Sequence, residues 1–173
     1  MWSVQNCGDK DLYFQIGAHP AFYYRDLDAN TCERGFLDFG KNTKTLKYIS
    51  PAEKGCVSEK EHTLELHDGL MELTSDTFGC DTYIFENGQV KKITLMDKQK
   101  APYLSLEFSS PLVAVWSPSA AHPDAPFVCI EPWYGRCDKV GYHGEFKDRE
   151  WMQHVEPGKS FEVGYSIILE DVK

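Results

Sequence analysis

Two side chains that lie at the ends of predicted strands could transfer a proton in a reaction. The first is His19. It stands in the run Gly17-Ala18-His19-Pro20, directly after a stretch with strand character. Pro20 biases His19 toward an extended backbone, and Gly17 and Ala18 leave room beside the imidazole. The arrangement suits a histidine that faces a cleft at a sheet end and acts as an acid or a base. The alternative is a core histidine that bonds to a backbone carbonyl.

The second candidate is Glu131, a carboxylate at the end of the apolar strand predicted over residues 127–130. Ile130 and Pro132 flank it, so we expect partial desolvation that raises its pKa toward the range of a general base. Trp133 follows and offers a flat apolar face of the kind on which sugar rings stack. The alternative is a solvent-exposed glutamate with core aromatic residues behind it.

A third candidate, Asp81, opens a predicted strand directly after a turn. Its carboxylate could accept hydrogen bonds from the hydroxyl groups of a ligand. Aspartate is also a common turn residue, so this signal gains weight only beside the other two.

Two segments begin like metal sites but lack the required ligands. Residues 26–37 start like an EF-hand loop, but Thr31 stands where the turn glycine belongs and Leu37 where the final glutamate belongs. Residues 61–67 place two glutamates and one histidine on one strand face, while His62 lies on the other. We therefore expect no metal ion and no cofactor.

Frequent turn signals separate short segments rich in β-branched and aromatic residues, which predicts a mainly β chain. The predicted strands cover residues 12–16, 45–49, 62–66, 90–95, 103–108, 112–116, 127–130 and 161–169. Many of them alternate apolar and polar residues with the strand period of two. Asn87-Gly88 predicts a hairpin turn, and helices are expected only over residues 70–78 and 146–155. Many strands with few helices indicate an antiparallel β-sandwich or barrel.

The start of the chain has strand character from its second residue. Trp2-Ser3-Val4 is predicted as a strand, and residues 6–11 as a hairpin turn into the strand over residues 12–16. A domain usually starts with a few loosely held residues, whereas this chain is expected to begin inside a sheet.

Length, charge and cysteine spacing limit the class of protein. The 173 residues suit one domain, and 18 basic against 27 acidic residues give a net charge of −9. Such an excess of acid disfavours nucleic acid and anionic membrane surfaces as partners. There is no apolar run of the ~20 residues that cross a bilayer, and the start lacks a signal-peptide pattern, which favours the cytoplasm. The six cysteines contain no Cys-x-x-Cys pair, so we expect reduced, mostly buried thiols.

Three segments, taken together in their order and spacing, resemble the aldose 1-epimerase (galactose mutarotase-like) family, and its LacX-like branch in particular. They are Gly17-Ala18-His19-Pro20-Ala21-Phe22, Asp81-Thr82-Tyr83-Ile84-Phe85-Glu86-Asn87 and Cys129-Ile130-Glu131-Pro132-Trp133. The resemblance covers almost the whole chain and implies an antiparallel β-sandwich of the galactose mutarotase-like supersandwich type. Members of the family carry a long N-terminal portion before the first segment. Residues 1–173 are therefore expected to be the C-terminal part of such a sandwich, and the sandwich to be partial.

The resemblance also implies a reaction, the interconversion of the α and β anomers of a free hexose. It gives Glu131 the role of base, His19 the role of acid and Asp81 the role of a hydroxyl-binding carboxylate. One base and one acid suffice for such ring opening, without a metal or redox cofactor. We expect Trp133 and Trp116 to form cleft walls, with a core position as the alternative for either.

Because the family's N-terminal portion is not expected in these 173 residues, functions other than catalysis are also considered. The family's N-terminal portion supplies an arginine and a second histidine to the sugar site, so a non-catalytic carbohydrate-binding module or a truncated inactive member is the alternative. A second copy of the chain or the missing N-terminal portion could complete the sheets. The sequence does not indicate which sugar is preferred.

Overall fold

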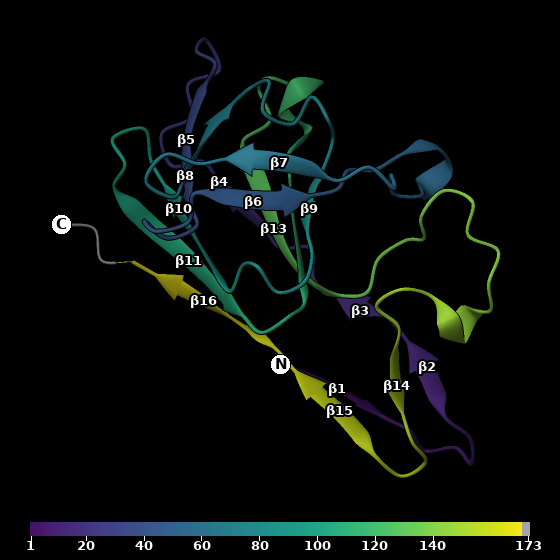
Figure 1. Ribbon diagram of the computed structural model, residues 1–173. Coiled ribbons are helices and arrows are strands. Elements are labelled where there is room, and N and C mark those ends of the chain that lie inside the picture. The colour runs from purple at the N-terminus through teal and green to yellow at the C-terminus, as the bar shows by residue number, and fades with distance from the viewer. Residues whose placement is uncertain (171–173) are drawn as a thin grey trace.

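Two five-stranded antiparallel sheets form the body of the molecule in the computed structural model, which describes residues 1–170 (Figure 1). The β10 sheet has the order β16 (Tyr165–Leu169), β11 (Pro102–Phe108), β10 (Lys92–Met96), β5 (Glu33–Asp38) and β8 (Leu70–Thr74). The β13 sheet has the order β3 (Ile16–Gly17), β13 (Phe127–Tyr134), β12 (Leu112–Trp116) and β9 (Tyr83–Phe85), with β4 (Ala21–Tyr23) also paired to β13. This confirms the mainly β, antiparallel sandwich class.

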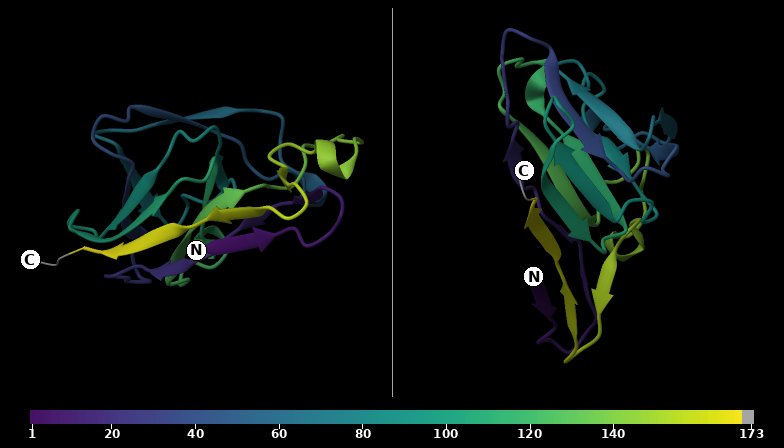
Figure 2. Two further views of the ribbon diagram at one scale, coloured as in Figure 1. Left: turned by 90° about the horizontal axis from the view of Figure 1, so that it is seen from below. Right: turned by 90° about the vertical axis from the view of Figure 1, so that its left-hand side faces the viewer.

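Three two-stranded ribbons accompany the sandwich. They pair β1 (Trp2–Gln5) with β15 (Ser160–Val163), β2 (Leu12–Phe14) with β14 (Gln153–Val155), and β6 (Thr45–Tyr48) with β7 (His62–Glu65). The first two ribbons extend away from the sandwich body (Figures 1 and 2). Within residues 1–170, helix is limited to single 3₁₀ turns at Glu53–Gly55, Pro118–Ala120 and Phe146–Asp148. No helix in the described part of the chain has the length and hydrophobicity that a membrane crossing requires.

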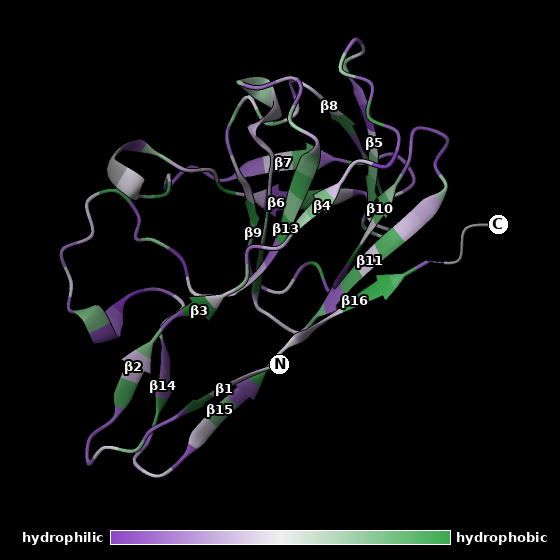
Figure 3. Cartoon of the chain, turned by 180° about the vertical axis from the view of Figure 1, so that it is seen from behind, coloured by the Kyte–Doolittle hydropathy of each residue, from purple (hydrophilic) through white to green (hydrophobic). Residues whose placement is uncertain are grey.

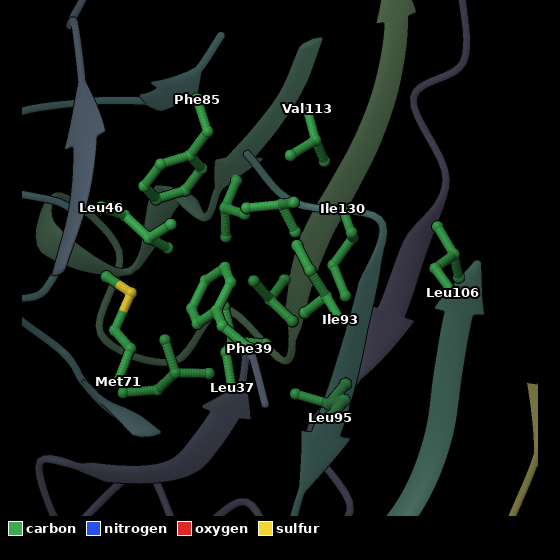
Figure 4. Close-up of a cluster of buried hydrophobic side chains, with 14 of the residues drawn as sticks. Leu37, Phe39, Leu46, Met71, Phe85, Ile93, Leu95, Leu106, Val113 and Ile130 are labelled. Atoms are coloured by element: carbon green, nitrogen blue, oxygen red, sulfur yellow. The ribbon is translucent and has the colours of Figure 1, made fainter. Parts of the chain in front are cut away.

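The main core lies between the two sheets and follows from the period-two pattern of their strands (Figure 4). The central strands β10 and β13 are largely hydrophobic in Figure 3, whereas the connecting loops are mostly hydrophilic. The fully buried side chains of this core include Leu37, Leu95, Leu106, Phe85, Val113 and Ile130. A smaller cluster lies on the other face of the β13 sheet and contains Ile49, Val57, Ile84, Leu112 and Ala114. The β13 sheet is therefore buried on both faces near its centre.

Both predicted helices are wrong. Residues 70–74 form strand β8, in which Met71 and Leu73 point into the core and pair with β5. Residues 146–155 form one 3₁₀ turn followed by strand β14, and Trp151 between them has a φ of 61° that no right-handed helix contains. In both segments pairing with a distant strand overrides the local pattern.

The turn at Asn87-Gly88 has the predicted backbone, but it does not close a hairpin. Asn87 and Gly88 have φ values of 62° and 61°, as a type I′ turn requires. Strand β9 before the turn pairs with β12, whereas β10 after it pairs with β11 and β5. The turn therefore carries the chain from one layer of the sandwich to the other.

The structure also changes the interpretation of the chain start and of the cysteines. Strand β1 begins at Trp2, but it pairs with β15 and not with β2, so residues 6–11 are not a hairpin turn. Cys129 is buried, while Cys7, Cys32, Cys80 and Cys137 are exposed thiols. The expectation of mostly buried cysteines is therefore wrong.

Candidate active site

Glu131 lies in the middle of β13, on the face of the sheet that points away from the main core. Its neighbours Ile130 and Val128 take the core face, and the strand pairing places Ala114 of β12 directly beside it. The small alanine side chain leaves space over the carboxylate. Even so, only 2% of the Glu131 side chain is exposed, because the surrounding segments cover it.

His19 reaches Glu131 because the segment that carries it is bonded to β13 on both sides. Strand β3 pairs with the end of β13 and β4 with its start, so the chain between them passes Glu131. The Ala18 N–H donates to the Pro132 carbonyl (3.1 Å) and the Ile130 N–H donates to the Pro20 carbonyl (3.3 Å). His19 Nε2 then lies 3.4 Å from Glu131 Oε1, with 62% of the His19 side chain exposed.

The environment of Glu131 favours its protonated form. Burial raises the pKa of Glu131 to about 8, and the side chain of Trp133 opposes part of this rise. Its Oε2 atom is buried and has no hydrogen-bond partner among the described residues. A carboxyl group tuned to this range, beside an exposed imidazole, is the arrangement expected of a general acid–base pair.

A pocket of about 430 Å³ opens in front of this pair, a volume typical of small-molecule sites. His19, Glu131 and Trp133 all line it, so the structure brings these three predicted residues together. The Trp133 indole N–H donates to the Ala18 carbonyl at 3.1 Å, which fixes the ring against the segment that carries His19.

The other two predicted residues lie beside this pocket. Asp81 and Trp116 line a neighbouring hollow of about 520 Å³. Trp116 still touches the pair, since its ring meets His19 edge-on at a centroid distance of 6.0 Å. Asp81 is exposed and accepts a hydrogen bond from the Thr82 hydroxyl at 2.7 Å. Because Thr82 lines the first pocket, Asp81 is one residue removed from that pocket along the chain.

Sequence reasoning missed two residues of the first pocket, Thr82 and Arg136. Arg136 is buried and donates to Glu86 Oε1 (2.6 Å), to Glu150 and to the Cys137 carbonyl. The Trp151 indole N–H donates to the same Glu86 oxygen at 2.8 Å. An arginine directly after Trp133-Tyr134-Gly135 was visible in the sequence, but its acidic partners come from distant segments.

A larger hollow of about 640 Å³ lies elsewhere, along Lys91, Lys92 and Tyr165. Its lining contains no carboxylate–imidazole pair, so the smaller pocket is the better candidate for acid–base chemistry.

The close approach of Gly17 to Trp133 gives a first prediction. A Cβ atom at position 17 would lie 2.5 Å from Trp133 Cδ1. Gly17→Ala should therefore push the indole aside, lower the free energy of unfolding by about 1–3 kcal/mol as overpacking does, and shift the tryptophan fluorescence. Denaturant unfolding and emission spectra measure both effects. Gly8→Ala, whose Cβ would meet only the Asn6 side chain at 3.4 Å, is the control; equal behaviour of the two variants would show that the ring is not held by this contact.

The chain has recognisable relatives of known sequence. No protein-family profile matches it. It is 23% identical over 163 residues to Protein LacX of Lactococcus lactis subsp. lactis, in both the chromosomal and the plasmid form. The alignment covers 93% of this chain and 54% of LacX, so the chain spans about half the length of the curated relatives it matches.

Solved structures share its fold. A galactose mutarotase related enzyme from Lactobacillus acidophilus is 27% identical, with a TM-score of 0.82 over 98% of this chain and 56% of that one. A galactose mutarotase-like protein from Lactobacillus casei is 23% identical, with a TM-score of 0.82 over 97% of this chain and 57% of that one. Sequence and fold together make the chain a relative of LacX and of the galactose mutarotase-like proteins, and they support the aldose 1-epimerase-like family.

Proposed function

We propose that this chain carries the acid–base site of an aldose 1-epimerase-type isomerase, which interconverts the α and β anomers of a free hexose. One observation carries the proposal: a buried carboxyl group with a raised pKa lies 3.4 Å from an exposed imidazole in a pocket of suitable size. The likeness to the L. acidophilus enzyme supports the same reaction class.

In the proposed mechanism, the Glu131 carboxylate takes the proton of the anomeric hydroxyl while protonated His19 donates a proton to the ring oxygen. The bond between C1 and the ring oxygen breaks, and an open-chain aldehyde forms. After rotation about the C1–C2 bond, His19 removes the proton from the attacking hydroxyl and Glu131 returns its proton to the carbonyl oxygen. Protons and electrons balance within the two side chains, whose roles reverse between opening and closure.

The geometry suits this sequence of steps. The anomeric hydroxyl and the ring oxygen are both bonded to C1, so the acid and the base must act close together. Because His19 is largely exposed, its imidazole has room to turn from Glu131 toward the ring oxygen when a sugar enters. Trp133 and Trp116 lie beside the pair, where they could hold the apolar face of the ring.

The direct test is polarimetry on freshly dissolved α-glucose and α-galactose, with the spontaneous reaction subtracted. We expect the optical rotation to reach equilibrium faster in proportion to protein concentration. A rate equal to the background for both sugars would contradict catalysis by this chain.

The pH dependence of the rate follows from the raised pKa of Glu131. Glu131 must be ionised to act as the base, so the rate should rise with pH on the acid side of the profile. Because the mechanism also needs a proton on His19, the profile should be bell-shaped and fall again on the alkaline side. On the acid limb the rate should fall by up to about tenfold per pH unit. Polarimetry between pH 5.5 and 9.5, in buffers with a chelator, measures the curve. A profile with no decline toward pH 5.5 would show that ionisation of Glu131 does not limit the rate.

A second candidate is a carbohydrate-binding module without catalysis. It is favoured by the observation that the chain spans only about half the length of its curated relatives. Saturable heat of sugar binding in calorimetry, together with background rates in polarimetry, would support this function over the first.

A further inference from the structure

The acid–base pair has a third neighbour that the proposed reaction does not use. Cys129 lies two residues before Glu131 on β13, so both side chains point to the same face of the sheet. His19 Nε2, Cys129 Sγ and a Glu131 carboxylate oxygen all lie within 4.8 Å of one another. Three different potential metal ligands therefore converge beside the pocket.

The donor set selects for one kind of cation. A thiolate, an imidazole nitrogen and one carboxylate oxygen suit Zn²⁺, whereas Mg²⁺ and Ca²⁺ prefer oxygen ligands alone. Glu131 is almost fully buried, and its Oε2 atom has no hydrogen-bond partner among the described residues. A buried polar atom without a partner is costly, and a bound cation would satisfy it.

The geometry needs only a small adjustment. Ligand atoms at zinc bond lengths of about 2.0–2.3 Å lie about 3.3–3.8 Å apart in a tetrahedron. Any separation near the 4.8 Å limit must therefore shrink by about 1 Å, which side-chain rotation of the ligands can supply, whereas His19 Nε2 and Glu131 Oε1 already lie 3.4 Å apart. Because His19 is exposed, solvent can supply the fourth ligand of a tetrahedral zinc ion bound there.

We propose that His19, Cys129 and Glu131 form a zinc site, and that zinc bound there inhibits the protein reversibly. On binding, the cation displaces the thiol proton of Cys129 and the carboxyl proton of Glu131 to solvent, and it takes a lone pair from each of the three ligand atoms. Inhibition, which rests on the proposed function, follows because the base and the acid of that reaction are then both occupied. Metal binding itself does not depend on the proposed function.

Cobalt absorption spectroscopy and zinc calorimetry on the full chain test the site without any assay of activity. Co²⁺ should give a thiolate-to-metal charge-transfer band, and Zn²⁺ should abolish it by competition, whereas Mg²⁺ should not. Cys129→Ser should remove the band and weaken zinc binding on the order of 100-fold, because the strongest donor is lost. His19→Ala alters an exposed residue, so it should weaken zinc binding without disturbing the fold.

Cys137→Ser is the matched control, because Cys137 lines the same pocket but lies outside the cluster. It should leave the cobalt band and the zinc affinity unchanged. A cobalt spectrum without a thiolate band, or equal zinc affinity in the wild type and in the Cys129→Ser and His19→Ala variants, would overturn the proposed site.

Polarimetry with zinc separates this proposal from the proposed function. Zinc should slow mutarotation by the wild-type protein, and a chelator should restore the rate. If the cobalt band depends on Cys129 but the protein has no epimerase activity, the zinc site stands and the proposed function fails. If mutarotation is catalysed but zinc does not slow it, the inhibition part of the proposal is wrong.

Discussion

Glu131→Gln should lower the rate of mutarotation by about 10³-fold, because the amide cannot accept the anomeric proton as the carboxylate does. The side chain keeps its shape, so the pocket and the contact with His19 should persist. Polarimetry at the pH optimum of the wild-type protein gives the largest difference. Glu107→Gln is the control, since Glu107 is half-exposed and paired with Lys92 away from the pocket. A rate within about twofold of the wild type would exclude Glu131 as the base.

The same substitution should change the pH dependence of stability. The folded-state pKa of Glu131 lies above its ordinary value of 4.5, so the folded protein holds this proton more tightly than the unfolded chain does. Its contribution to stability is therefore present at low pH and is lost as pH rises from about 4.5 to about 8.

Urea unfolding at several pH values measures this effect. The wild type should lose on the order of a few kcal/mol across that window relative to Glu131→Gln, and the difference should stay constant above it. Parallel curves for the two proteins between pH 5 and pH 8 would show that the carboxyl is not buried as the structure has it.

Arg136→Met should cost about 3–5 kcal/mol of unfolding free energy, because it removes the cation from a buried ion pair. The guanidinium is almost fully buried and donates to Glu86 and Glu150, while Trp151 also bonds to Glu86. Methionine fills part of the space but leaves the Glu86 carboxylate without its main partner. Urea unfolding at pH 7 measures the loss.

Two further variants make the Arg136 result specific. Adding Glu86→Gln to Arg136→Met should recover part of the lost stability, since the unpaired charge is removed. Arg149→Met breaks the more exposed pair with Asp138 and should cost about 1 kcal/mol or less. Equal losses for Arg136→Met and Arg149→Met would contradict a special role for the buried pair.

The fold class could be predicted because its signals are local. The segment over residues 103–108 alternates with the strand period and residues 112–116 are a short apolar run, and they form β11 and β12. The helices predicted over residues 70–78 and 146–155 failed because their short patterns fit either state, and pairing with β5 and β2 decided between them. The Asn87-Gly88 turn shows the same limit, since its backbone was predicted but the partners of its two strands were not.

The sequence by itself determined the mainly β class and the residue types that could do acid–base chemistry, because strand period and local flanks are properties of neighbouring residues. Only the tertiary structure decided that His19 and Glu131, which lie 112 positions apart (131 − 19), meet at 3.4 Å. It also decided that Cys129 lies beside this pair, that Asp81 lines a neighbouring hollow, and that Arg136 is buried between two glutamates. Strand pairing over long loops sets these contacts and the burial that raises the pKa of Glu131, and no local pattern encodes which distant strand will be the partner.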